Sequence, residues 1–139
     1  MKKPTWKSLL LILALILQGQ AFSQITVSDE KLQKVAELYE TSLVEGEKFQ
    51  ESLDSLMQKN GMTPERLLEI QRMRNNIDLS EVEIETVKKI EQARSEFSDA
   101  FDEIIINKGM TPEEYRRILY EMQNDDELQE RFTALFTID

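Results

Sequence analysis

The chain has 139 residues, of which 40% are hydrophobic and 32% are charged, and its formal net charge is −10. This length suits one small domain, and the acidity disfavours nucleic acid and anionic membrane surfaces, which bind through Lys and Arg. The sequence contains no His and no Cys, which excludes His-based acid–base pairs, thiol nucleophiles and disulfides. We therefore expect a non-enzymatic protein with no catalytic residues, no cofactor, no metal site and no nucleic-acid partner.

Residues 1–23 have the three parts of a secretory signal peptide. Lys2, Lys3 and Lys7 precede the apolar run 9–17, and residues 18–23 end in the pattern Ala-Phe-Ser. An uncleaved membrane anchor is the alternative, but a spanning helix needs roughly 20 apolar residues. We expect cleavage after Ser23, which leaves a periplasmic or secreted chain, 24–139, with a formal charge of 17 − 3 − 27 = −13. Contact with a membrane is then limited to the signal peptide before cleavage.

The first predicted helix spans about residues 29–59. Ser28 is its expected N-cap, two acidic residues follow, and Val27 and Leu32 have the spacing of a hydrophobic staple. Gly46 lies in the apolar seam, where glycine costs on the order of 1 kcal/mol relative to alanine. We therefore expect a neighbouring helix to pass close to Gly46; a hinge is the alternative. The seam repeats at spacings of three and four residues and consists of Leu32, Val35, Tyr39, Ser42, Gly46, Phe49, Leu53 and Leu56.

Two copies of one five-residue motif follow the two long helices. In each copy, glycine comes just after the helix end, where a positive φ is often required. Threonine caps the next helix, proline takes its first position, and glutamate lies near the positive end of the helix dipole. The methionine has staple spacing to Leu67 in the first copy and to Tyr115 in the second. The copies are Gly61, Met62, Thr63, Pro64 and Glu65, and Gly109, Met110, Thr111, Pro112 and Glu113.

The second and third helices are short and long, respectively. The second follows Thr63 and fades at residues 74–76. Ser80 and Glu83 form a capping box that predicts the start of the third helix. Its apolar seam continues to about residue 105.

Two more short helices complete the prediction. The fourth helix follows Thr111, and Glu114 is expected to complete a capping box there. Asn124 and Glu127 have the same spacing, so we expect them to cap a fifth helix near the C-terminus.

An internal repeat underlies this order of elements. Residues 49–70 align without gaps on residues 97–118, at an offset of 48 residues. The two segments share a Phe, an Asp, the five-residue motif and an Ile at equivalent positions. We predict repeat units of about 28–76 and 80–136 within a single helical domain, 24–139. The predicted fold is all-α: an antiparallel hairpin of two long helices, with short helices packed at its ends.

The last two predicted helices carry a dense apolar set. Burial of such side chains is worth about 1.5–3 kcal/mol each, so they are not expected to remain in water. We favour the interpretation that they cover one end of the hairpin within the same chain. The alternative is that part of this face docks a protein partner or a second copy of the chain. The set is Tyr115, Ile118, Leu119, Met122, Leu128, Phe132, Leu135 and Phe136.

Three segments, 27–32, 109–118 and 126–131, resemble an exported bacterial helical family known as domain of unknown function DUF4168. The resemblance implies a signal peptide and a helical fold, and it brings no known activity. Met110 stands where that family usually has Leu, and the additional motif at Gly61 resembles a longer variant. A weaker likeness, limited to the turns, is to periplasmic stress chaperones with Leu-Thr-x-x-Gln repeats at helix starts.

We expect a protein-interaction module of the cell envelope that binds a partner or itself. The alternative is a periplasmic chaperone or an envelope stress-response protein.

Overall fold

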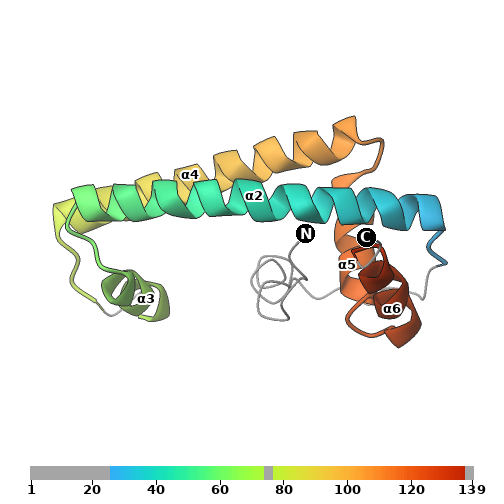
Figure 1. Ribbon diagram of the computed structural model, residues 1–139. Coiled ribbons are helices and arrows are strands. Elements are labelled where there is room, and N and C mark those ends of the chain that lie inside the picture. Colours follow the sequence, from blue (N-terminus) through green and yellow to red (C-terminus); the bar gives the residue numbers. More distant parts are fainter. Residues whose placement is uncertain (1–25, 74–76, 137–139) are drawn as a thin grey trace. The chain divides into compact units, whose positions relative to one another are not determined.

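The computed structural model describes residues 26–73 and 77–136, and this part of the chain is built from helices without a strand (Figure 1). The predicted signal peptide and its cleavage site lie outside the described residues, as do residues 74–76. The predicted all-α class is confirmed. The helices are α2 (Asp29–Lys59), α3 (Pro64–Arg72), α4 (Glu81–Asn107), α5 (Pro112–Glu121) and α6 (Asp126–Ala134).

The contacts divide the chain into two compact units. Unit 1 contains the residues up to Thr41 and those from Asp102 onward, and unit 2 contains Ser42–Phe101. Each long helix contributes one part to each unit. These boundaries differ from the repeat units predicted from the sequence, which separate between residues 76 and 80.

Unit 2 is built from the C-terminal part of α2, α3 and the N-terminal part of α4. The rings of Phe49 and Phe97 stack across the two long helices, with centroids 4.4 Å apart and planes 13° apart. Met57 of α2 lies in the same core cluster as Ile90 of α4. Residues nearer the C-terminal end of α2 therefore pack against residues nearer the N-terminal end of α4. This confirms the predicted antiparallel pairing of the two long helices. The core cluster consists of Leu53, Met57, Met62, Leu67, Ile70 and Ile90.

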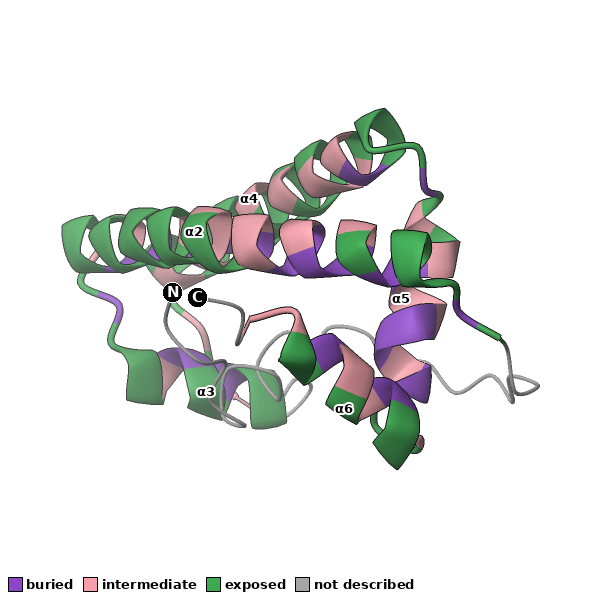
Figure 2. Cartoon of the chain, turned by 45° about the vertical axis from the view of Figure 1, so that its right-hand side comes forward, coloured by how far each residue is buried: buried purple, intermediate pink, exposed green. Residues whose placement is uncertain are grey.

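Unit 1 is built around the N-terminal part of α2, the end of α4, α5 and α6. The ring of Tyr39 makes edge-on contacts with Phe132, at 5.7 Å between centroids, and with Phe136, at 6.1 Å. Figure 2 shows buried residues along this part of α2 and on α5. The side chains of Leu32, Val35 and Tyr39 are almost completely buried, as expected from the seam that the sequence predicts.

Gly46 does not have the close neighbour that we predicted. A Cβ atom added at this position would meet no other atom within 4 Å, and the residue is half-buried in mid-helix. The prediction was wrong because helical periodicity tells which residues share a face but not whether another helix covers that face at each turn. The large side chains that follow Ser42, at Leu43 and Val44, are exposed.

Candidate functional site

The two glycine motifs form turns of the same geometry, as predicted. Gly61 and Gly109 have φ values of 65° and 78°, and no other described residue has a positive φ. In the first turn, the Met62 N–H donates to the Met57 carbonyl at 2.9 Å and the Gly61 N–H donates to the Gln58 carbonyl at 3.2 Å. The second turn repeats this pair of bonds at Met110 and Gly109. The pattern is a Schellman motif, which satisfies carbonyls that a helix end leaves unpaired.

Each turn also caps the helix that follows it. The Thr63 hydroxyl accepts a bond from the Arg66 N–H at 3.1 Å, and the Thr111 hydroxyl accepts one from the Glu114 N–H at 3.1 Å. Pro64 and Pro112 are the first helical residues, Glu65 and Glu113 lie in the first turns, and Met62 and Met110 are buried. All these features serve to join helices, so the motif is a structural turn. Whether the two copies arose from a duplicated 48-residue unit stays a prediction.

Two of the predicted capping boxes differ from the structure. The box of Ser80 and Glu83 is present, with reciprocal bonds of 2.9 and 3.2 Å. The Glu114 carboxylate, however, pairs with Lys31 of α2 instead of turning back to the cap, because a cation from a neighbouring helix lies within reach. Helix α6 is capped by Asp125, whose carboxylate accepts from the Leu128 N–H at 2.9 Å.

The predicted cap of α6, Asn124, belongs to the preceding turn. Its side-chain amide donates to the Tyr120 carbonyl at 3.3 Å. Asn124 and Asp125 can both cap a helix, and the sequence pattern placed the start one residue too early.

The candidate partner face lies mostly in the core of unit 1. Six of its eight side chains are buried, and the remaining two, Leu135 and Phe136, are half-buried. Phe132 and Phe136 contact each other and both contact Tyr39. The burial supports the interpretation that these residues cover their own chain, and it leaves only Leu135 and Phe136 within reach of a partner. The six buried side chains are Tyr115, Ile118, Leu119, Met122, Leu128 and Phe132.

Ion pairs connect α6 and the end of α4 to the start of α2. Arg131 donates to the Val27 carbonyl at 2.9 Å and to the Asp29 carboxylate at 2.6 Å. Lys108 donates to Glu37 at 2.9 Å, and this bond, followed by the charge of Lys108, lowers the pKa of Glu37. Exposed pairs of this kind contribute little to stability because solvent screens them, so apolar burial dominates the stability of unit 1.

Arg66 connects three segments of unit 2. Its Nε donates to Glu83 at 2.6 Å, its Nη1 to Glu69 at 2.7 Å and its Nη2 to the Asp78 carbonyl at 3.3 Å. The Arg66 bond, followed by the Ser80 N–H, lowers the pKa of Glu83 to about 2. Sequence spacing gave no signal for this pairing, because Arg66 and Glu83 are 17 residues apart and lie on different helices.

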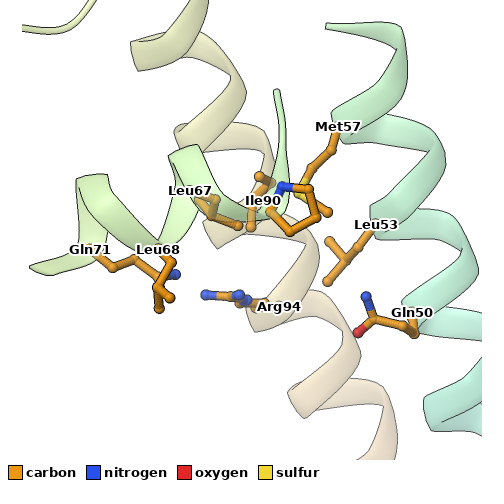
Figure 3. A pocket seen from close by; sticks show the side chains of 9 residues that line it. Gln50, Leu53, Met57, Leu67, Leu68, Gln71, Ile90 and Arg94 are labelled. Atoms are coloured by element: carbon orange, nitrogen blue, oxygen red, sulfur yellow. The ribbon is translucent and has the colours of Figure 1, made fainter. Parts of the chain in front are cut away.

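A pocket of about 240 Å³ opens between α2, α3 and α4 in unit 2. Its floor consists of buried core side chains, whereas Leu68 and the polar residues at its edge are exposed. Figure 3 shows Arg94 of α4 between Leu68 and Gln71 of α3 on one side and Gln50 of α2 on the other. Sequence reasoning did not find this pocket. The lining residues are Gln50, Leu53, Met57, Pro64, Leu67, Leu68, Gln71, Ile90 and Arg94.

Two polar groups on α5 are buried without a hydrogen bond in the described part of the chain. They are the Oε1 atom of Glu121, a residue only 9% exposed, and the Nε atom of Arg117. The sequence held a signal for Glu121, since it follows Ile118 by three residues and so falls on the apolar face of α5.

Within residues 26–73 and 77–136, no three or more acidic side chains are grouped so that they could hold a metal ion. None of the helices in these same ranges has the length and apolar character needed to cross a membrane.

Comparison with known protein families gives a match for part of the chain. Residues 79–132, which contain α4, α5 and most of α6, match the model of the family described as Domain of unknown function (DUF4168). The matched range includes the second glycine motif, and the first motif and the segment 27–32 lie before it. No curated protein and no solved structure matches the chain. The chain is therefore similar to the DUF4168 family over residues 79–132, which supports the resemblance that the sequence predicts.

Proposed function

We propose that this chain is an exported, non-enzymatic helical protein of the bacterial cell envelope and that it acts by binding another protein. The observation that carries the proposal is the uneven exposure of large apolar side chains. Seven such residues are exposed in the described part of the chain, and only Ile106 lies in unit 1. The other six are in unit 2 and are Leu43, Val44, Leu68, Met73, Val82 and Ile84.

The exposure of Leu68 and Met73 in unit 2 has a structural cause. In unit 1, α5 is followed by α6, which adds Leu128 and Phe132 to the core. The described part of unit 2 has no helix that corresponds to α6, so α3 leaves Leu68 and Met73 in contact with water. Exposed apolar residues that gather in one region mark interaction sites more often than exposed residues that are scattered singly.

The export part of the proposal is supported by the sequence of residues 1–23, with its lysines, apolar run and small residues at the end. N-terminal sequencing of the protein recovered from outside the cytoplasm should begin at Gln24. Recovery of a chain that still shows the fluorescence of Trp6, the single tryptophan, would contradict cleavage.

The binding part can be tested with a matched pair of variants. In a crosslinked pull-down from envelope extract, we expect the wild type to retain one partner in constant ratio and the double variant Val82→Ser, Ile84→Ser to lose it. Ile106→Ser is the control, because Ile106 is 58% exposed, like Val82 at 57%, but lies in unit 1.

An equal loss of the partner in both variants, or no loss in either, would contradict the assignment to unit 2. The alternative function, a chaperone for unfolded clients, predicts a different result. The purified protein would then suppress the aggregation of several unrelated client proteins and would retain no single partner.

A further inference from the structure

We propose that the pocket of unit 2 binds an aliphatic carboxylic acid, with its hydrocarbon chain on the apolar floor and its carboxylate on Arg94. This inference does not depend on the proposed protein partner, because it concerns a small ligand, and the pocket lining shares only Leu68 with the exposed apolar residues of unit 2. It rests on the composition of the floor, the state of Arg94 and the reason why the pocket is open.

The floor is apolar and belongs to the core cluster of the unit. Leu53, Met57, Leu67 and Ile90 line the pocket and are each at most 9% exposed. They offer no polar atom to a ligand, so the part of a ligand that lies on them has to be apolar. A volume of about 240 Å³ is below the roughly 300–1,000 Å³ of pockets for drug-sized molecules. A single hydrocarbon chain therefore suits the pocket better than a ring system.

The edge of the pocket carries a cation without an acidic partner. Arg94 forms no hydrogen bond or ion pair with any residue in the described part of the chain, although the chain has 27 acidic residues. A guanidinium binds a carboxylate through two parallel bonds. Gln71 adds a second side-chain donor on the opposite wall, whereas the amide nitrogen of Gln50 already donates to Asp54 at 2.8 Å.

Comparison of the two turns explains why the pocket is open. With the offset of 48 residues, Leu53 corresponds to Phe101, and Leu67 corresponds to Tyr115. Leucine is smaller than Phe and Tyr, so these two positions carry less side-chain volume beside the first turn than their counterparts carry beside the second.

The third difference between the turns concerns charge. Leu68 corresponds to Arg116, which pairs with Asp102 in unit 1. In unit 2, the corresponding aspartate, Asp54, accepts a hydrogen bond from the side-chain amide of Gln50. Position 68 is a leucine, so it places no second cation beside Arg94. Seven of the nine lining residues lie before residue 79, outside the range that matches the family, whereas Ile90 and Arg94 lie within it.

The test is a titration of the purified chain with hexanoate, octanoate and decanoate, followed in carbon-13 methyl spectra. We expect saturable shifts at the methyl groups of Leu53, Met57 and Ile90. Each added CH₂ that is buried should tighten binding by roughly fourfold. Decanol, which has the same chain without the charge, should bind more weakly than decanoate.

Two variants separate the carboxylate contact from general apolar binding. Arg94→Gln should weaken the binding of decanoate by roughly three- to tenfold and leave that of decanol unchanged. Lys88→Gln is the matched control, because Lys88 is an exposed cation of the same helix that does not line the pocket. Arg94 is itself exposed, so its replacement should leave the fold intact, which circular dichroism can verify.

Several results would overturn the inference. Equal binding of decanol and decanoate, or equal effects of the two variants, would show that Arg94 does not recognise a carboxylate. Shifts confined to methyl groups outside the pocket, or the absence of saturable shifts, would show that the pocket is not the site. A peptide with a C-terminal leucine that binds much more tightly than all three acids would show that the ligand is a chain terminus of a protein.

Discussion

Replacement of three glycines by alanine should change the stability in opposite directions. Gly46 lies in mid-helix, and Gly61 and Gly109 lie in the turns with φ values of 65° and 78°. Steric contact of the added Cβ atom does not decide the change in stability at any of the three positions. A Cβ atom at Gly46 or Gly61 would meet nothing within 4 Å, and at Gly109 it would meet only the Lys34 Nζ at 3.9 Å. The backbone conformation alone therefore sets the sign.

The magnitudes follow from that conformation. Gly46→Ala should raise the free energy of unfolding by about 1 kcal/mol, the difference in helix propensity between the two residues. In the turns, an alanine in the left-handed region costs about 1–2 kcal/mol. Part of this cost is offset by about 0.4–1 kcal/mol, because alanine also restricts the unfolded chain. We therefore expect a net loss of about 1 kcal/mol for Gly61→Ala and for Gly109→Ala.

Urea unfolding followed by circular dichroism can measure these differences. Gly46 and Gly61 both belong to unit 2, so they can be compared directly. With a slope of about 1–3 kcal/mol per M urea, their unfolding midpoints should separate by roughly 0.7–2 M. A lower midpoint for Gly46→Ala would mean that another helix covers the seam there. A higher midpoint for Gly61→Ala would mean that the turn does not hold the left-handed conformation.

Three further measurements address the caps, an ion pair and the core. Thr63→Ala and Thr111→Ala should each lower the free energy of unfolding by about 0.5–2 kcal/mol in urea titrations, and unchanged midpoints for both would contradict their role as caps. Glu83 has its pKa lowered from 4.5 to about 2 by Arg66 and then by Ser80, so its contribution to stability is present above pH 4.5 and is lost as the pH falls toward 2. In urea titrations, the difference in free energy of unfolding between wild type and Glu83→Gln should therefore shrink as the pH falls over that range. Glu91→Gln is the control. A difference that stays constant with pH would refute the pairing of Glu83 with Arg66. Phe132→Ala should cost about 3–5 kcal/mol in thermal unfolding without a change of assembly in sizing chromatography, whereas a folded monomer of unchanged stability would place this ring at an interface.

The sequence predicted the parts of the fold that depend on local chemistry. The turns at Gly61 and Gly109 are specified within five residues, because glycine, threonine and proline each fit one backbone position there. The bounds of α2 were also predicted, since the cap at Ser28 and the turn at Gly61 mark its two ends. At α6, two neighbouring residues could both serve as the cap, and local reasoning chose Asn124 over Asp125.

Features that depend on contacts between distant segments were not predictable in the same way. Whether Gly46 is covered depends on the path of other helices, which the periodicity of α2 does not contain. The bond between Arg66 and Glu83 requires that α3 and the start of α4 lie side by side. The pocket at Arg94 depends on the sizes of side chains from three helices, and no single stretch of sequence records them together.

The methionines described above differ in how easily an oxidant can reach them. Met57, Met62, Met110 and Met122 are buried in the two cores, whereas Met73, at the end of α3, is 46% exposed. Oxidation of a buried thioether would place a polar sulfoxide among apolar side chains and disrupt their packing. The exposed thioether can be oxidised without this cost. Mild peroxide should therefore convert Met73 first and leave both cores folded, so that a cell could repair or tolerate this lesion without losing the protein.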